Sequence, residues 1–403
     1  MPRKLDLRSG TPVWSAYRSP AVPADRLTRD VNADVLIVGM GISGAMMAQA
    51  LMRDGHSVIC IDRRGPLKGS TAATTALVQF EIDQPLTRLS MMIGGDAARQ
   101  AWRRSRLALL NLRGRIAELE ISCRSADRPS LYLAGNKLDA SGLHQEVAAR
   151  RQAGIGASFL TREKLRGGFG IERAAAILSH DNLALDPRKL TSGLLMAALQ
   201  RKARFFAPAE ATAIEDNRLG VTVSTRDGPL ITARHLVLTT GYELLDIVPS
   251  VSHRIISTWA IATRPQPRNL WPLAAMIWEA SDPYLYVRAT SDGRVICGGE
   301  DEEFTDEDKR NALTPKKTTS LTNKLGKIFP QLDTTAEFAW SGSFGATGTG
   351  LPIIGSVPDH PRVHAILGYG GNGITFSQIA SEVVSGSIAG REDADADLFA
   401  FER

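Results

Sequence analysis

The stretch ADVLIVGMGISGAMMAQAL, residues 33–51, decides the fold class. Its apolar run DVLIV is typical of a strand that is buried on both faces. Residues 42–53 are rich in Ala, Met, Leu and Gln, which favours a helix. A second apolar run, SVICI, follows this helix and closes on Asp62. Residues 34–62 therefore predict a strand, a helix and a second strand that pack as one β-α-β unit.

Three glycines stand at the turn into this helix with the spacing G-x-G-x-x-G. Gly39 allows the tight turn, Gly41 lets a pyrophosphate approach the backbone, and Gly44 allows the helix to pack closely on the strand. The free N–H groups at the helix start, near Ile42 and Ser43, would bind phosphate. The spacing therefore predicts a dinucleotide site, and a glycine cluster that only serves helix packing is the competing interpretation.

An acidic residue closes the second strand of the unit. Asp62 lies 23 positions after Gly39, close to the roughly 20 expected for a carboxylate that binds a ribose hydroxyl. A carboxylate there disfavours a 2′-phosphate, so NADP is a poor candidate. Arg63 and Arg64 follow directly and weaken this exclusion slightly, and Arg63 is itself a candidate cofactor contact. The β-α-β unit alone does not distinguish FAD from NAD.

Two segments further along the chain favour FAD. KGSTAATTALVQFEID, residues 68–83, places the hydroxyls of Ser70 and Thr71 where a second phosphate or a ribityl chain would run. HLVLTTGYE is an apolar strand that ends at Thr240 and Gly241, a pattern common where a strand passes under a dinucleotide. An NAD enzyme would need nothing at the first of these segments.

A third segment lies near the C-terminus. GYGGNGITFSQIASEVV opens a helix with Gly370, Gly371 and Gly373. The positive end of that helix would stabilise the negative charge that develops on a reduced isoalloxazine ring. The three segments together, in this order on one chain, predict FAD.

The same motifs resemble the D-amino-acid-oxidase superfamily of FAD-dependent oxidoreductases, which includes glycine oxidase, sarcosine oxidase and γ-glutamylputrescine oxidase. The resemblance covers nearly the whole chain and rests on VLIVGMGISGAMMAQAL, GSTAATTA, HLVLTTG, SDGRVICGGEDEEF, TGTGLPIIG and LGYGGNGITFSQIA. It implies an α/β FAD-binding Rossmann-like domain and an α+β substrate domain with a mainly antiparallel sheet over the flavin. It also implies oxidation of a C–N bond by hydride transfer to flavin N5, giving an imine that hydrolyses.

This interpretation divides the chain into segments. The FAD-binding domain is expected from residues 1–85, 175–248 and 340–403, and the substrate domain from 86–174 and 249–339. The expected FAD contacts are Gly39, Gly41, Ile42, Ser43, Gly44, Asp62, Arg63, Ser70, Thr71, Thr240, Gly241, Gly350, Leu351, Pro352, Gly370, Gly371, Asn372, Gly373, Ile374 and Thr375.

The chain departs from the family pattern at four positions. In α-amino-acid oxidases that this chain resembles, an arginine clamps the substrate carboxylate, and Phe344 stands at about the corresponding position here. A simple α-amino acid is therefore a poor substrate candidate. Sarcosine oxidases attach FAD covalently through a cysteine, and Gly342 or a neighbour stands at about the corresponding position here. Noncovalent FAD is therefore expected. Sarcosine oxidases have a lysine beside the flavin, and Ile296 stands at about the corresponding position here. The missing lysine weakens the case for oxygen as electron acceptor. Thr349 replaces the usual acid of a T-x-D-G-L-P stretch.

Candidate substrate contacts come from two segments. Gln79 and Glu81 follow the expected flavin-binding segment, and Glu81 would hold a cationic amine. Arg288 alternates with Tyr286 and Tyr284 on an expected roof strand, so the three share a face, and Arg288 would pair with a carboxylate at the far end of a substrate. Solvent-facing roles for Glu81 and Arg288 are the competing interpretations.

The composition is that of an ordinary globular chain. Its 403 residues suffice for two domains, 43% are apolar, and the net charge of +5 is mild. Three separated cysteines (Cys60, Cys123 and Cys297), with no signal peptide and no apolar run that could cross a bilayer, indicate a cytoplasmic protein with reduced thiols. The seven histidines form no metal-ligand pattern. Neither the substrate nor the oligomeric state is indicated.

The sequence leaves three possible functions. The first is an FAD-dependent amine or amino-acid-derivative oxidase, or a dehydrogenase that uses another electron acceptor. The second is an NAD-linked dehydrogenase with the same β-α-β unit, which leaves the C-terminal glycine helix unexplained. The third is a protein that binds membrane or nucleic acid through the arginines of a predicted helix at 96–119, and a solvated helix face explains those arginines more simply. A small-molecule amine and no nucleic acid are therefore the expected partners.

Overall fold

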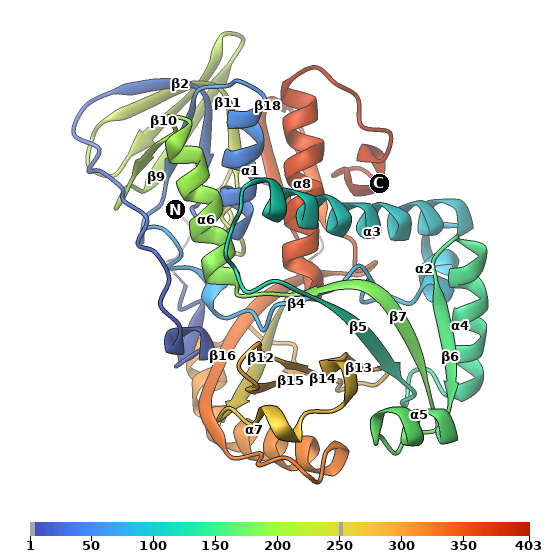
Figure 1. Ribbon diagram of the computed structural model, residues 1–403. Coiled ribbons are helices and arrows are strands. Elements are labelled where there is room, and N and C mark those ends of the chain that lie inside the picture. The colour runs from blue at the N-terminus through green and yellow to red at the C-terminus, as the bar shows by residue number, and fades with distance from the viewer. Residues whose placement is uncertain (1–4, 250–252) are drawn as a thin grey trace.

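The computed structural model describes residues 5–249 and 253–403, and it shows two large sheets that meet near the middle of the molecule (Figure 1). The first, here named the nucleotide sheet, has the strand order β17-β18-β11-β2-β3-β8, with β10 and β9 continuing from β11. Its strands are β2 (Val31–Val38), β3 (Val58–Ile61), β8 (Arg204–Phe206), β9 (Ala211–Asn217), β10 (Gly220–Thr225), β11 (Leu230–Leu238), β17 (Ile353–Val357) and β18 (His360–Leu367).

The centre of the nucleotide sheet is parallel and buried on both faces. β18, β11, β2, β3 and β8 pair in parallel, and β17 closes the edge antiparallel to β18. Along β2, Val35 and Ile37 face one core, whereas Leu36 and Val38 face another. Burial on both faces explains why this strand reads as an uninterrupted apolar run.

Helices cover one face of this sheet. α1 (Ile42–Arg53) packs between α6 (Pro187–Gln200) and α8 (Gly373–Ile388), as Figure 1 shows. α6 begins as the sequence predicts, because the carboxylate of Asp186 accepts hydrogen bonds from the backbone N–H groups of Arg188 and Lys189 at 3.0 and 3.1 Å. The predicted β-α-β unit is confirmed, and α1 spans the predicted residues.

The second sheet, here named the roof sheet, lies below the nucleotide sheet in Figure 1 and has the order β1-β16-β12-β15-β14-β13-β5-β7-β4, with β6 paired to β7. Its strands are β1 (Arg8–Gly10), β4 (Leu77–Val78), β5 (Ala126–Leu133), β6 (Ala157–Thr161), β7 (Ala175–Ala184), β12 (His253–Thr263), β13 (Met276–Glu279), β14 (Leu285–Ala289), β15 (Val295–Glu302) and β16 (Ala336–Thr347). α7 (Glu307–Ile328) covers its outer face.

The expectation of a mainly antiparallel sheet is corrected to a mixed sheet. The neighbouring strands in the order β1-β16-β12-β15-β14-β13 all pair antiparallel, and so do those in the order β5-β7-β4. β13 and β5, where these two groups meet, pair in parallel. β5 and β13 come from distant parts of the chain. Propensity and local turn chemistry do not specify such a pairing.

The division of the chain into two domains stays a prediction, but the strands of the two sheets can be compared with its predicted boundaries. β1, β4 and β7 fall within segments expected for the FAD-binding domain, yet they pair in the roof sheet. β16 belongs to the roof sheet over its whole length, although the predicted boundary at residue 340 divides it. The chain therefore crosses between the two sheets more often than apolar patterning indicates.

The remaining helices are α2 (Leu86–Ile93), α3 (Gly95–Glu118), α4 (Ala140–Gln152) and α5 (Arg162–Phe169). α3 is the long helix predicted at 96–119, and its apolar line through Trp102 and Leu109 is buried. Arg106 and Arg113 on its neighbouring face pair with Asp181 and Asp127, so a solvated, ion-paired face accounts for the arginine line. No helix in the described residues combines the length and apolarity that a bilayer crossing requires.

Candidate active site

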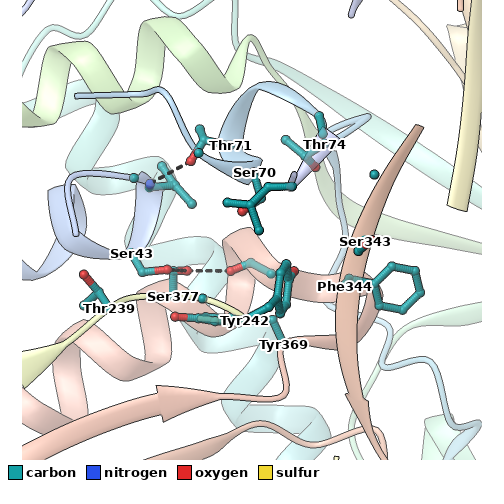
Figure 2. A pocket seen from close by; sticks show the side chains of 18 of the residues that line it. Ser43, Ser70, Thr71, Thr74, Thr239, Tyr242, Ser343, Phe344, Tyr369 and Ser377 are labelled. Carbon is teal, nitrogen blue, oxygen red and sulfur yellow. Dashed lines mark hydrogen bonds between the residues drawn. The ribbon is translucent and has the colours of Figure 1, made fainter. Parts of the chain in front are cut away.

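An elongated cavity lies between the two sheets, at the carboxyl ends of β2, β3 and β11 (Figure 2). β11 and β3 lie on opposite sides of β2, so the strand order reverses there, and open α/β sheets bind ligands at such a switch point. The roof sheet contributes the opposite wall through residues of β12, β14 and β16. The part of this one cavity that lies under the roof sheet is lined by Asp83, Thr258, Trp278, Tyr284 and Tyr286 and is here named the far chamber.

The turn from β2 into α1 has the geometry that its glycines predict. Gly39 has φ of +113°, and its N–H donates to the carbonyl of Ile61 at 2.8 Å. A Cβ on Gly44 would lie 1.9 Å from the carbonyl oxygen of Gly39, so only glycine fits at that crossing. α1 begins at Ile42, whose N–H donates to Thr71 Oγ1 at 3.0 Å (Figure 2).

Asp62 is held in place by three backbone donors. Its Oδ2 accepts from the N–H of Met40 at 2.9 Å, and its Oδ1 accepts from those of Arg64 at 2.7 Å and Gly65 at 2.8 Å. A carboxylate oxygen has two acceptor sites, so Oδ2 retains capacity for a ribose hydroxyl. Since Asp62 lines the cavity, the geometry suits the role predicted for it.

A charged cluster at this end of the cavity was missed by sequence reasoning. Glu243 accepts two hydrogen bonds of 2.6 Å from Arg64 and also pairs with Arg63, which lies 3.5 Å from Glu210. Burial raises the pKa of the Glu243 carboxyl, but the hydrogen bonds from Arg64 and Leu5 and the charges of Arg64 and Arg63 together outweigh burial, and the net pKa is lowered. Only the adjacency of Arg63 and Arg64 gave a sequence signal, because their partners follow far along the chain.

The start of α8 forms the other end of the cavity. Asn372 Nδ2 donates to the carbonyls of Gln79 and Glu81 at 3.2 and 2.8 Å, and Thr375 Oγ1 donates to that of Gln79 at 2.7 Å. The segment after β4 is thereby fixed to the helix start. Ser43 and Ser377 contact each other at 2.8 Å and join α1 to α8 (Figure 2).

Asp83 is a further residue that sequence reasoning missed. Its Oδ2 accepts from the backbone N–H of Gly371 at 2.8 Å, and the side chain is open to the cavity. Removal from bulk solvent raises the pKa of the Asp83 carboxyl, and the hydrogen bond from Gly371 partly offsets the rise. Strand alternation gives no signal for Asp83, because β4 ends at Val78 and Glu81, between Gln79 and Asp83, is turned away from the cavity.

Most predicted cofactor contacts line the cavity. These are Gly39, Gly41, Ile42, Ser43, Asp62, Arg63, Ser70, Thr71, Thr240, Gly241, Gly370, Gly371, Asn372, Gly373 and Ile374. The lining does not include Gly44, Gly350, Leu351, Pro352 and Thr375. Gly44 and Thr375 support the lining through the contacts described above, and Leu351 is buried in the core behind it.

The structure places the predicted substrate contacts in different environments. Gln79 lines the cavity, and its Nε2 is buried without a hydrogen-bond partner among the described residues. Glu81 is turned away, since its Oε1 accepts from Ser130 at 2.5 Å and lies 3.7 Å from Arg150. The side chain of Glu81 is 2% exposed, so it does not reach a cavity ligand.

Arg288 is also buried outside the cavity lining. Its Nη1 donates to the carbonyls of Ala76 and Leu185 at 2.6 and 3.0 Å, and burial lowers its pKa to about 10. Its neighbours Tyr284 and Tyr286 do line the cavity. Strand alternation thus found the correct face of β14, but backbone carbonyls of another segment already bind the guanidinium.

The positions where the chain departs from the family pattern can also be located. Phe344 and Gly342 line the cavity, whereas Ile296 is fully buried in the core. Cys60, Cys123 and Cys297 are free, buried and absent from the lining. Within the described ranges, the basic residues of the lining are Arg63 and Arg64 alone, both next to Glu243.

Comparison with known proteins decides between the two dinucleotides. Residues 34–386 match the family of FAD dependent oxidoreductases called DAO. The chain belongs to this family. It is therefore an FAD-dependent oxidoreductase, as the sequence motifs predict, and the NAD-linked alternative is not supported.

Individual relatives are distant in sequence. A protein of Bacillus subtilis (strain 168) named "Putative Rieske 2Fe-2S iron-sulfur protein YhfW" is 21% identical over 94% of this chain and 73% of its own length. Glycine oxidase from Geobacillus kaustophilus has a TM-score of 0.75 at 20% identity, over 92% of this chain and 99% of that one. L-proline dehydrogenase from P. horikoshii has a TM-score of 0.76 at 18% identity, over 92% and 97% of the two chains. These solved structures share the fold.

The residues of the cavity fit FAD. The turn at Gly39 and Gly41 leaves room for a diphosphate, because no side chain projects there, and Asp62 offers an acceptor beside it. Gln79 lines the cavity, and its buried Nε2 has no hydrogen-bond partner in the part of the chain that the structure describes. A buried polar group of this kind is stabilised by a ligand that supplies the missing partner.

Proposed function

We propose that this enzyme oxidises the C–N bond of a small amine or amino-acid derivative held between the start of α8 and the roof sheet. Bound FAD supplies the chemistry by accepting a hydride from the carbon next to the nitrogen. The substrate loses a hydride and a proton and becomes an imine, which water then hydrolyses to a carbonyl compound and an amine. The observation that carries this proposal is one cavity lined by both the nucleotide turn and the roof strands.

The chain's own residues serve binding and orientation in this reaction. Asp62 and the turn at Gly39 hold the adenosine and diphosphate parts, and the predicted contacts along Ser70 and Thr71 hold the middle of the cofactor. The aromatic side chains of Trp278, Tyr284 and Tyr286 line the far chamber and exclude water from the reacting carbon. We expect noncovalent FAD, which the absence of cysteine from the described lining supports.

A second candidate concerns the electron acceptor. The described lining contains no lysine, and the carboxylate of Asp83 lies at the start of α8. Transfer of an electron to oxygen creates a small anion, which a neighbouring carboxylate disfavours. This arrangement favours a dehydrogenase that passes electrons to another acceptor over an oxidase. The relative named as a Rieske iron-sulfur protein is compatible with such an acceptor.

The test begins with the purified protein and its flavin. The protein should be yellow, and acid precipitation should release free FAD. Anaerobic addition of amines, N-methyl amino acids or imino acids should bleach the visible flavin band. Gly44→Val, which places side-chain atoms against Gly39, should give a protein without FAD and without this response. A flavin that stays oxidised with every compound would contradict the proposed C–N oxidation, and a colourless protein that takes up no FAD would contradict the cofactor assignment.

The three free, buried cysteines support a cytoplasmic location, because disulfides are rare in that compartment. We include this location in the proposal.

A further inference from the structure

The roof strand β15 carries a bulge directly over the far chamber of the cavity. The register between β12 and β15 shifts opposite Thr258, which faces both Glu300 and Asp301. Gly299 has φ of +133° and Glu300 has φ of +60°. A bulge places two residues opposite one and redirects a side chain, and bulges of this kind concentrate next to active sites.

The bulge is fixed from the outer side by α7. Lys317 Nζ donates to the carbonyl of Glu300 at 2.8 Å, and the Glu300 carboxylate pairs with Lys324. Glu300 therefore faces the lysines of α7. The next residue, Asp301, lies beside Thr258 and Tyr284, both of which line the cavity.

Asp301 forms no ion pair among the described residues, and the nearby charge of Lys317 is paired with Glu300 and Glu302. Asp301 Oδ1 is buried without a hydrogen-bond partner among those residues. Burial raises the pKa of the Asp301 carboxyl to about 6, while the hydroxyls of Thr258 and Tyr284 act in the opposite direction. A carboxylate in this environment is stabilised by any cation that enters the chamber.

Asp83 adds a second negative charge on the same side of the chamber. It lines the cavity beside Gly370 and Gly371, and its charge raises the pKa of Asp301. The basic residues of the described lining lie at the opposite, nucleotide end and are already paired with Glu243. The far chamber is therefore lined by the carboxylate of Asp83, and no basic side chain of the described lining balances that charge.

The aromatic side chains complete a surface that suits a cation. The rings of Tyr284 and Tyr286 lie 5.5 Å apart, and Trp278 stacks on Tyr132 with ring centroids 3.8 Å apart. Ring faces attract ammonium groups. If Tyr284 donates its hydroxyl hydrogen to Asp301, its oxygen remains free to accept a hydrogen bond from a ligand in the cavity.

We propose that Asp83, together with Asp301 and Tyr284, holds an ammonium group of the substrate, so that the enzyme selects amines with a second cationic nitrogen and no carboxylate beside the oxidised nitrogen. This inference rests on the proposed C–N oxidation. The nitrogen that is oxidised needs its lone pair to form the C=N bond, so the ammonium group that contacts Asp83 and Tyr284 is a different nitrogen of the same substrate. Asp301 acts through Tyr284 and is a positioning residue.

The experiment compares matched substrates with the FAD-loaded enzyme under anaerobic conditions. N-methyl diaminobutane is set against N-methylbutylamine, which lacks the second charge, and against N-methylglycine, which carries a carboxylate. We expect the diamine to bleach the flavin with a half-saturating concentration at least about tenfold lower than either comparison compound. Tighter bleaching by N-methylglycine or equal behaviour of the two amines would overturn the proposal, although the proposed C–N oxidation would stand.

Three variants test the residues. Asp83→Asn and Asp301→Asn should each raise the half-saturating concentration for the diamine about tenfold or more, and change that for the monoamine by less than about threefold. Glu303→Gln, which removes a carboxylate near the bulge that pairs with Arg254 at the surface, should change neither. If both aspartate variants keep the wild-type preference for the diamine, the proposal is wrong.

A binding measurement separates a structural role from cation recognition. A bis-quaternary diammonium compound has no lone pair to oxidise, so its binding to the holoenzyme can be followed by the shift of the flavin spectrum. Binding should weaken in Asp83→Asn at constant flavin content. As the pH falls through about 6, binding should weaken in the wild-type enzyme and weaken less in Asp301→Asn, where only Asp83 remains to take up a proton. Binding that is equal in all variants and independent of pH would overturn the proposal.

Discussion

At the scale of single residues, Asp62 shows how one carboxylate ties the nucleotide turn together. Replacement by asparagine keeps the size of the side chain but places an N–H₂ group against backbone donors from Met40, Arg64 or Gly65. Hydrogen bonds to a charged group contribute about 1.5–3 kcal/mol each. We therefore expect Asp62→Asn to raise the FAD dissociation constant about 10- to 100-fold, measured by flavin fluorescence titration of the apoprotein.

A matched control exists at the C-terminal end of α1. Asp54 pairs with Arg391 outside the cavity, and Asp54→Asn should leave FAD binding within about twofold of wild type. Unchanged affinity in Asp62→Asn would mean that this carboxylate does not contact the cofactor's ribose.

His364 gives a prediction about pH. It lies on β18, is 2% exposed, and neither ring nitrogen has a hydrogen-bond partner among the described residues. Burial lowers the pKa of His364 from the ordinary 6.5 to about 4, with a smaller contribution from the neighbouring His235. The pKa of His235 is itself lowered by burial and by the charges of Arg362, His56 and Arg234. The folded state therefore resists a proton that the unfolded chain accepts. Stability is lost as the pH falls below about 6.5 and levels off below about 4.

The size of this effect follows from the shift. A change of one pKa unit corresponds to about 1.4 kcal/mol, so lowering the pH from 7 to 5 should cost about 2 kcal/mol of unfolding free energy through His364. Urea unfolding at both pH values should show this loss in the wild type and a smaller loss in His364→Leu. An equal loss in both proteins would contradict the assignment to His364.

At the scale of elements, the N-terminal segment 5–10 closes one side of the cavity. The N–H of Leu5 donates to Glu243 Oε1 at 2.7 Å, and Arg64 donates to the carbonyl of Leu5 at 2.8 Å. β1 then pairs with β16, and Leu7 between these two attachments lines the cavity. The segment therefore spans from the nucleotide end to the roof sheet.

Removal of residues 1–10 should open this side of the cavity. We expect bound FAD to dissociate about tenfold faster or more, because the segment contributes two hydrogen bonds to the Glu243 cluster and one side chain to the lining. Transfer of released FAD to an excess of another apoflavoprotein measures the rate. Ser9→Ala, which removes only the contact with Ser341, is the control, and an unchanged release rate in the truncated protein would show that the segment is not a closure.

At the scale of the whole molecule, the predictable parts are those fixed by neighbours in sequence. The turn at Gly39 and the helix start at Asp186 depend on a few adjacent residues, and both were found from the sequence. Arg64 meets Glu243 across 179 positions, and no local pattern specifies that pair. Arg288 lies on the expected face of β14, but carbonyls from distant segments bind it. Backbone acceptors leave no trace in side-chain patterning.

The distribution of charge over the molecule leads to the last prediction. The chain has a net charge of +5, yet the far chamber presents Asp83, with Asp301 behind Tyr284, and no basic residue of the described lining. An unfavourable unit charge in a partly buried site costs a few kcal/mol. Oxygen that accepts an electron becomes a small anion with concentrated charge, whereas a quinone spreads the accepted charge over its ring. We therefore expect re-oxidation of the substrate-bleached enzyme to be at least about tenfold slower in air than with an uncharged quinone.

Asp83→Asn should speed the reaction with air about tenfold, whereas Glu303→Gln should not, as stopped-flow absorbance would show. Re-oxidation in air that is as fast as with quinone in the wild type would identify an oxidase instead.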